Sequence, residues 1–297
     1  MSVQAVYGTV KKTIIDKNFK VKRTVLRMIV TIVMFCLGIA IIIPFLWMIS
    51  ASFKRPLDVL KYPVEWIPKY WYPQNYIDIM SKQSYNFGLM YLNSIKITAI
   101  NVTGSVLTSC LAGYAFARLK FKGRDHLFLL YLATMIIPPQ VTMVPRFMLF
   151  DFLGIINTHW SLILPGIFTP FGVFMMRQFF MQIPFELSES ARIDGAGEIK
   201  TWAQIIMPLA KTAIVTLVIL TFCWHWNDYE NPLIFLRDRK LLTIPVGLDL
   251  FKDEAFTDAN LNLILAAATL SIMPIFIIFT AGQKYFIEGM AAGAVKG

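Results

Sequence analysis

Long apolar runs separated by short polar segments dominate the hydrophobicity pattern of this chain. Six of them are near or above the roughly 20 residues that an α-helix needs to cross the hydrocarbon core of a bilayer. They lie at residues 28–51, 90–117, 126–149, 159–181, 212–236 and 261–283. The pattern therefore predicts an all-α integral membrane protein with six transmembrane helices, within a domain of residues 28–286.

Prolines make the third and fourth runs the least regular of the six. They are Pro138, Pro139, Pro145, Pro165 and Pro170. Such breaks are tolerated inside a membrane only where neighbouring groups bond the freed backbone atoms. We therefore expect both spans to be interrupted and closely packed.

The polar segment 182–211, between the fourth and fifth runs, has the features of two short helices joined by a turn. Pro184 can open the first helix, because its missing N–H would be unbonded there in any case. Gly195 suits the left-handed position that closes many helices. Residues 198–204 can form a second helical turn, and Pro208 can start the next span. We predict a rigid helical element, centred on residues 184–204, on the membrane surface.

Composition supports a membrane protein and argues against a nucleic-acid partner. Hydrophobic residues make up 57% of the chain and charged residues only 15%, whereas soluble domains carry about a quarter charged residues. The net charge of +10 is concentrated beside the apolar runs, in residues 11–27, 118–124 and 192–211. By the positive-inside rule, both termini and the 182–211 segment are cytoplasmic, and residues 1–27 form a basic cytoplasmic tail. This tail can also contact anionic lipid.

No residue pattern in the chain indicates catalysis. Cys36, Cys110 and Cys223 lie far apart in separate runs, without the spacing of a disulfide framework or a metal site. The phosphate-binding loop and the common hydrolase motifs are missing. Acidic and histidine chains at membrane depth, which ion-coupled carriers usually need, are also missing. We expect no catalytic residue, metal or cofactor here, and we expect energy for any transport to come from a separate ATPase.

Polar side chains at the outer ends of two runs are candidates for a substrate pathway. Lys96 lies roughly 9 Å inside the second run at 1.5 Å per residue, where it can reach back to the interface or face a water-filled path. The fifth run closes on Trp224, Trp226, Asn227 and Asp228. These side chains could stack on a sugar and hydrogen-bond to it, although interfacial anchoring explains the tryptophans equally well.

Small residues predict one helix-packing face. Ser105, Ser109, Gly113 and Ala117 recur at intervals of four in the second run. Small side chains at this spacing let two membrane helices approach closely. The loop 52–89 carries Trp66, Tyr70, Trp71 and Tyr72, which are typical of a membrane interface and less typical of a sugar-stacking surface.

Several motifs together resemble one known family. Glu189-Ser190-Ala191, Gly195, Ile205 and Met207-Pro208 are similar to the "EAA" signature of permease subunits of binding-protein-dependent ABC importers, with Ser190 and Met207 as small departures. The run from Ala191 to Gly197, which includes Asp194 and Ala196, resembles the carbohydrate branch, typified by the second permease of the maltose transporter. Further similar stretches are Asn93-Ser94, Gly113 to Arg118, Asn157-Thr158, Trp226-Asn227-Asp228 and Ala292 to Gly297.

The resemblance implies a permease core that pairs with a second, homologous permease in the cell (inner) membrane. In the family the 182–211 segment, here named the coupling segment, docks in a cleft on a cytoplasmic ATPase dimer that binds ATP and Mg²⁺. The coupling residues that this implies are Glu189, Ser190, Ala191, Asp194, Gly195, Ala196, Ile205 and Pro208. The C-terminal tail, residues 287–297, reaches between the ATPase subunits in the family and assigns Lys296 and Gly297 to the same interface. Residues 237–258 are expected to contact an extracytoplasmic solute-binding protein.

The expected function is import of a sugar or oligosaccharide. One alternative keeps the importer and changes the cargo to a polar solute such as glycerol phosphate, for which Lys96 is the candidate cation. The sequence also admits a stand-alone secondary carrier or an intramembrane enzyme, but neither of these explains the coupling segment.

Overall fold

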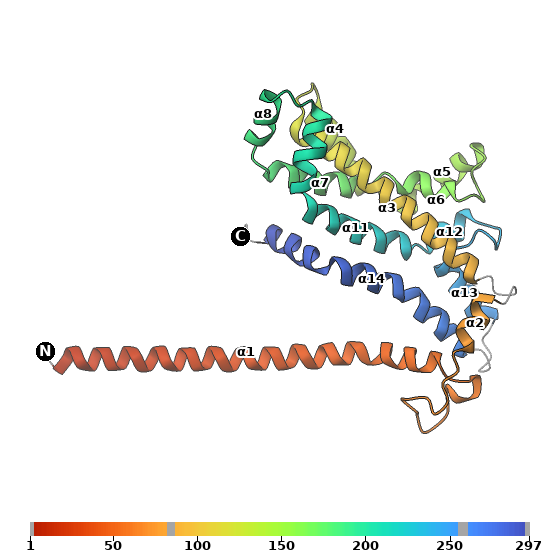
Figure 1. Ribbon diagram of the computed structural model, residues 1–297, viewed down its shortest axis with the longest axis horizontal. Coiled ribbons are helices and arrows are strands. Elements are labelled where there is room, and N and C mark those ends of the chain that lie inside the picture. The colour runs from red at the N-terminus through yellow and green to blue at the C-terminus, as the bar shows by residue number, and fades with distance from the viewer. Residues whose placement is uncertain (1–2, 82–86, 255–260, 295–297) are drawn as a thin grey trace.

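The computed structural model describes residues 3–81, 87–254 and 261–294, and all regular structure in these ranges is helical. Figure 1 shows a slanted bundle, with the long first helix set apart along one side and joined to the rest at its far end. The start of α1, the end of α14 and helix α8 lie toward the same side of the molecule, whereas α2, α12 and α13 lie at the opposite end.

The elements alternate long helices with short connecting ones. The first half of the chain contains α1 (Val3–Ser52), η1 (Pro56–Asp58), α2 (Gln74–Ser81), α3 (Phe87–Arg118), α4 (Arg124–Ala133), η2 (Thr134–Ile136) and α5 (Pro139–Phe152). The middle contains α6 (Trp160–Gly166), α7 (Pro170–Gln182), α8 (Glu186–Ile193), α9 (Glu198–Thr201), the π-helical turn η3 (Trp202–Ile206) and α10 (Met207–Leu209). The remainder contains α11 (Lys211–Trp226), α12 (Glu230–Phe235), α13 (Ile244–Glu254) and α14 (Leu261–Ala294).

Several helices are long and apolar enough to cross a membrane, which confirms the predicted all-α membrane fold. Four such stretches occur in the described chain: Lys22–Ser52, Phe87–Arg118, Trp160–Gln182 and Leu261–Ile287. Two bent pairs raise the number to as many as six, if each pair is one span: Arg124–Ile136 with Pro139–Phe152, and Glu198–Leu209 with Lys211–Trp226.

One predicted span is interrupted by its prolines as expected, and another is shorter than predicted. The run 126–149 is not one straight helix, because the chain bends by 99° between its two halves. Ile137 has extended backbone angles there, as expected for a residue next to the Pro138-Pro139 pair. The run 212–236 is too long, because α11 ends at Trp226 and the chain resumes as the short helix α12.

Helix α3 is polar toward the protein and apolar outward, which is the arrangement expected of a span solvated by lipid. Its buried polar side chains are Asn93, Ser94, Thr98, Asn101, Ser105 and Ser109. Its exposed side chains include Leu92, Ile95, Ile100, Leu107 and Leu111. Small and polar residues hold membrane helices together, since apolar contact with a neighbouring helix gains little over contact with lipid.

The predicted small-residue face of α3 is confirmed as its contact with α7. A Cβ atom added at Gly113 would lie 2.8 Å from the Cβ of Met176 and 3.0 Å from the backbone nitrogen of Arg177. One added at Gly172 would lie 2.3 Å from the Ser109 hydroxyl. The two backbones therefore approach as closely as glycine permits.

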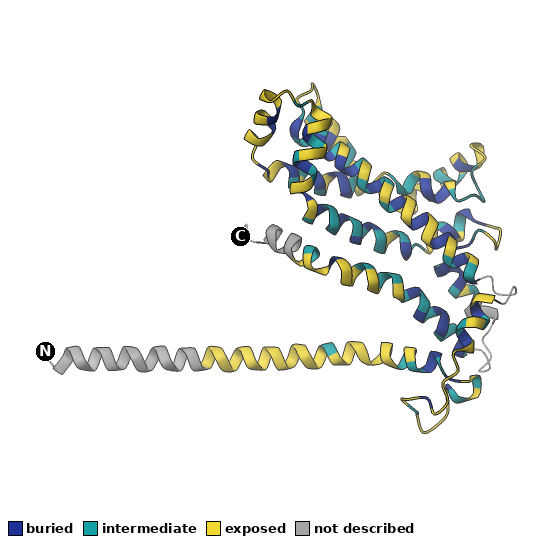
Figure 2. Ribbon diagram, in the orientation of Figure 1, coloured by how far each residue is buried: buried dark blue, intermediate teal, exposed yellow. Residues whose placement is uncertain are grey.

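Among the side chains that the structure describes, buried apolar residues form three clusters, and none of these includes a residue of α1. One cluster, near the coupling segment, joins α3, α7 and α11 through Tyr114, Phe180, Ile206 and Leu217. Figure 2 shows that the described part of α1 is almost entirely exposed until its last turns. There, the Asn75 side-chain amide donates to the Ser52 carbonyl over 2.7 Å and ties α1 to α2.

Candidate functional site

The coupling segment begins as the predicted helix and left-handed turn. Gly195 has a φ of +80°, which confirms the sequence prediction, since residues with a side chain adopt this region rarely. The Gly195 N–H donates to Arg192 over 3.0 Å, and the Ala196 N–H donates to Ala191 over 2.9 Å. These two bonds satisfy carbonyls at the end of α8 in the manner of a Schellman motif.

Its boundaries differ slightly from the prediction. Helix α8 begins at Glu186, with Phe185 as its N-terminal cap, so Pro184 lies one residue before the cap. Pro208 does not start the next span, because it lies in α10. The chain then bends by 81°, and the following span begins at Lys211.

The second half of the coupling segment contains the π-helical turn η3. Such turns are rare and occur often at functional sites. Ile206 in this turn is fully buried and packs with Ile205 in the cluster near the coupling segment. The segment is therefore anchored to the bundle by apolar contact as well as by its chain connections.

Glu198 links three parts of the structure through its carboxylate. Its Oε1 is 2.7 Å from Arg192 Nη2, at the end of α8. Its Oε2 accepts a hydrogen bond of 2.9 Å from the hydroxyl of Tyr114, in α3. Because charged hydrogen bonds are stronger than neutral ones, this group fixes α8, α9 and α3 relative to one another.

Arg118 performs a similar function at the entry to the coupling segment. Its side chain is buried, and its guanidinium donates to the carbonyls of Phe180, at 2.7 Å, and of Ile183. The same group lies 5.6 Å from the centre of the Phe185 ring. A cation at a helix C-terminus satisfies carbonyls that the helix leaves unbonded, so Arg118 holds the α7–α8 connection in place.

Sequence reasoning did not assign functions to Tyr114, Arg118, Arg192 and Glu198. The first two belong to a stretch, Gly113 to Arg118, that stood out only for its resemblance to the family. In a sequence, a basic residue such as Arg118 at the end of an apolar run indicates membrane topology. The carbonyls that Arg118 binds are 62 and 65 positions away, so no nearby residues predict these hydrogen bonds.

The exposed face of the coupling segment carries most of the predicted coupling residues. Glu189, Ser190, Asp194, Gly195 and Pro208 are exposed, Ala196 and Ile205 are half-buried, and Ala191 is buried. Two large apolar side chains also project outward, with Ile193 at 86% and Ile199 at 80% exposure. Lys296 and Gly297 lie outside the described residues.

The proposed pathway residues do not form one group. Lys96 is exposed on α3, and Trp224 is 49% exposed with its ring against Phe171, at 5.2 Å between centres. Asn227 is exposed, and its amide donates to the Cys223 carbonyl over 2.8 Å.

Trp226 and Asp228 are held inside the protein. Trp226 is 3% exposed, stacks on Phe222, and donates its indole N–H to the Ser271 carbonyl over 2.9 Å. This corrects the expectation that it could stack on a sugar, because in this conformation the indole is a core side chain. Asp228 is half-buried and accepts two hydrogen bonds of 3.0 Å from the Asn231 amide.

Arg146 extends this polar group into the bent helix pair. Its guanidinium donates to the Asn231 side-chain oxygen over 2.5 Å and lies 5.0 Å from the centre of the Phe235 ring. The sequence analysis did not single it out, because the partners that make it tolerable at an apolar site lie 85 and more positions away.

The described residues contain no group of three metal-binding side chains. Cys36, Cys110 and Cys223 are free thiols. With an exposed helical surface at one end and only scattered polar groups elsewhere, the described geometry supports docking of a partner.

Comparison with known proteins identifies the family of the chain. The chain is 35% identical to the melibiose/raffinose/stachyose import permease protein MelC of Bacillus subtilis over 279 residues, which covers 93% of this chain and 99% of that protein. It is 33% identical to the trehalose/maltose transport system permease protein MalG of Thermococcus litoralis over 265 residues, covering 88% and 94% respectively.

Its fold matches a solved structure described as a bacterial ABC transporter involved in the import of the acidic polysaccharide alginate. The TM-score is 0.77, the sequence identity is 23%, and the match covers 88% of this chain and 96% of that one. Residues 105–291 match the family of inner membrane components of binding-protein-dependent transport systems. This multi-pass membrane protein therefore belongs to that family, as a permease subunit and not an enzyme.

Proposed function

We propose that this chain is a permease subunit of an ATP-driven importer for a sugar or oligosaccharide, and that it forms half of the pathway with a second, homologous permease. The relatives above carry oligosaccharide, disaccharide or polysaccharide names, which favours a carbohydrate cargo over glycerol phosphate. Pairing with a second permease agrees with the extensive exposed apolar surface of α1 and of the bent pair α4–α5.

The coupling segment would dock on a cytoplasmic ATPase dimer. The observation that carries this proposal is the carboxylate of Glu198, which binds Arg192 and Tyr114 and so ties the two helices of the coupling segment to α3. The exposed Ile193 and Ile199 at its tip would enter the cleft of the partner. ATP and Mg²⁺ would bind on the ATPase chains, and this chain would supply none of their ligands.

Three connections would carry movement of the ATPase into the membrane. The hydrogen bond from Tyr114 reaches α3, the Arg118 guanidinium reaches the end of α7, and the bend after α10 leads into α11. Displacement of the coupling segment would therefore move three helices together, as alternating access requires.

The opposite end would meet the solute-binding protein. The turn between α12 and α13 exposes Arg237, Asp238, Arg239 and Lys240. The Asn157 side-chain oxygen accepts from the backbone N–H groups of Arg237 and Asp238, both at 2.9 Å. This shaped polar turn lies within the predicted contact region, 237–258.

Transport in vesicles tests the proposal. Proteoliposomes containing this chain, the second permease, the ATPase and the binding protein should take up raffinose or a related oligosaccharide only when ATP is present. Flux of sugar down its gradient through this chain alone would contradict the proposal, as would ATP-driven uptake of glycerol phosphate without sugar uptake.

Substitution of exposed isoleucines tests docking of the ATPase separately from transport. Ile193→Ser should reduce the amount of ATPase that copurifies, because it removes an apolar contact from the tip. Ile67→Ser is the matched control, since Ile67 is 76% exposed in the loop at the opposite end. Equal recovery of ATPase from both variants would contradict docking at the coupling segment.

A further inference from the structure

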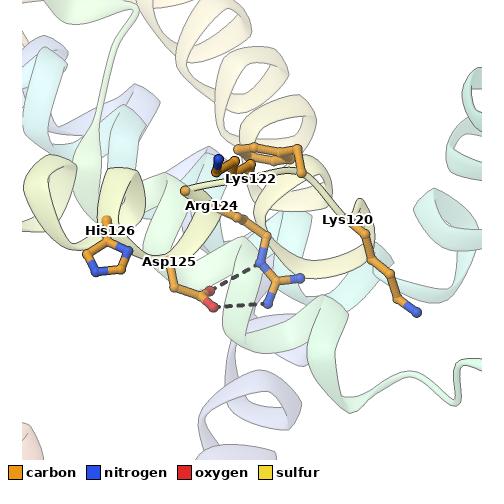
Figure 3. A pocket seen from close by; sticks show the side chains of 7 residues that line it. Lys120, Lys122, Arg124, Asp125 and His126 are labelled. Atoms are coloured by element: carbon orange, nitrogen blue, oxygen red, sulfur yellow. Dashed lines mark hydrogen bonds and ion pairs between the residues drawn. The ribbon is translucent and has the colours of Figure 1, made fainter.

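A basic pocket lies beside the coupling segment, where α3 passes into α4. It is open, has a volume of about 580 Å³, and is lined by Lys120, Phe121, Lys122, Gly123, Arg124, Asp125 and His126 (Figure 3). Three of these residues are cationic and one is anionic. The pocket therefore carries a surplus of positive charge.

Neutralisation of its single carboxylate comes from two arginines. Asp125 Oδ1 is 3.1 Å from Arg124 Nε and 3.4 Å from Arg177 Nη2. Figure 3 shows Arg124 turned toward Asp125, with Lys120 extending away from that pair. Among the residues that the structure describes, Lys120 and Lys122 form no ion pair, so two ammonium groups remain available to an anion.

The pocket opens next to an apolar surface. Helix α4 follows directly and exposes Leu127, Leu129 and Leu130, at 53%, 63% and 68%. The Arg177 side chain, which pairs with Asp125, also lies 4.1 Å from the centre of the buried Phe128 ring and thereby ties α7 to α4. Cationic side chains followed in the chain by exposed leucines match a phospholipid, in which a charged headgroup is attached to acyl chains.

We propose that the pocket of residues 120–126 binds the phosphate of an anionic phospholipid headgroup, with the acyl chains lying along α4. A free phosphate would use the ammonium groups and gain nothing from the leucines. Basic residues directly beside the end of a transmembrane helix attract anionic lipid headgroups. Occupancy would hold the α3–α4 turn, and through Arg177 and Asp125 also α7, at the membrane surface next to the coupling segment.

Photochemical labelling tests the proposal on the full-length chain, purified with the subunits that accompany it, in phosphatidylcholine nanodiscs. A phosphatidylglycerol probe with a photoreactive headgroup should label a peptide within residues 119–130. A phosphatidylcholine probe with the same reactive group should label it far less. Unlabelled phosphatidylglycerol should suppress the labelling, whereas inorganic phosphate should not.

Three variants remove ammonium groups and two others serve as controls. Lys120→Gln and Lys122→Gln should each lower labelling about fivefold, and the double variant Lys120→Gln/Lys122→Gln should lower it further. The double variant Lys120→Arg/Lys122→Arg should retain it. The double variant Lys11→Gln/Lys12→Gln changes charge in the basic tail by the same amount as the double glutamine variant of the pocket, and it should leave labelling of this peptide unchanged.

Equal labelling by both probes would overturn the proposal, as would unchanged labelling of the Lys120→Gln/Lys122→Gln variant. Competition by inorganic phosphate would also overturn it, since the site would then take a soluble anion. The measurement needs neither ATP nor sugar, so its outcome is independent of the proposed transport function.

Discussion

Tyr114 and Glu198 lie 84 positions apart in the chain and are joined by a hydrogen bond of 2.9 Å. Tyr114 belongs to a membrane-spanning helix, whereas Glu198 begins the second helix of the coupling segment. This bond is therefore a direct connection between the surface on which a partner would act and the bundle that would move.

Removal of this hydrogen bond should weaken coupling without unfolding the protein. Tyr114→Phe keeps the aromatic contact with Phe180, at 6.3 Å between ring centres, and leaves Glu198 bonded to Arg192. Because Glu198 is partly exposed, we expect loss of this hydrogen bond to lower the free energy of unfolding by only about 1 kcal/mol. The expected result is a reduced rate of ATP-driven uptake in proteoliposomes, with a normal amount of assembled complex. Tyr62→Phe, at the opposite end, is the control, and equal uptake by both variants would contradict a coupling role.

Glycine should be required at position 195 because the backbone there is left-handed. An added Cβ at Gly195 or at Gly197 would meet nothing within 4 Å, but only Gly195 has a positive φ, +80° against −71°. Gly195→Ala should therefore lower the free energy of unfolding by about 1 kcal/mol, and Gly197→Ala should lower it much less. Thermal unfolding of the two purified variants measures the difference.

Proline at the same position should uncouple transport. Gly195→Pro imposes a φ near −65°, so the membrane spans should still insert while the coupling segment loses its shape. Asparagine tolerates the left-handed region better than other residues with a side chain, so Gly195→Asn should retain most activity. Wild-type uptake by Gly195→Pro in vesicles would show that the shape of the turn does not matter.

Arg118 should stabilise the protein through the geometry of its guanidinium as well as its charge. Arg118→Lys keeps the charge, but one ammonium group cannot reproduce the forked donor arrangement that serves two carbonyls. We expect Arg118→Lys to lower the free energy of unfolding by about 2 kcal/mol and the melting temperature by several degrees. Arg55→Lys, in an exposed pair with Asp58, should change the melting temperature little. A melting temperature for Arg118→Lys equal to that of the wild type would show that charge alone suffices.

The close approach of α3 and α7 should tolerate no added carbon. Gly113→Ala places a methyl group against the backbone of α7. We expect this overpacking to lower the free energy of unfolding by about 1–3 kcal/mol. Gly38→Ala is the matched control, because Gly38 is also inside a helix and has no atom within 4 Å of an added Cβ. Thermal unfolding in detergent should separate the two, and a stable Gly113→Ala variant would mean that the helices can move apart freely.

The parts of the fold that depend on local pattern could be predicted from the sequence. Apolar length located the spans, the interval of four located the packing face at Ser105 to Gly113, and the preference of glycine for positive φ located the turn at Gly195. Each of these signals acts within a few residues of the feature that it determines. For the same reason, Pro138 and Pro139 predicted an interruption of the run 126–149, which the structure has at Ile137.

Features that depend on distant neighbours could not be predicted. Trp226 has the same local signature as an interfacial tryptophan, and only its contacts with Phe222 and the Ser271 carbonyl place it in the core. Arg118 and Arg146 are both explained by carbonyl, amide or ring partners that the chain brings back from far along its length. A sequence pattern identifies such residues as unusual without naming their partners.

The isolation of α1 has a further consequence for how the protein is built. Since no described side chain of this helix enters the three apolar clusters, and since Asn75 bonds to Ser52 in its last turn, the exposed surface of its described part can change in evolution without disturbing the interior of the subunit. Exchange of residues 22–45 with the equivalent stretch of a relative should yield a chimaera that folds normally. Only the binding of partners that contact this helix should change.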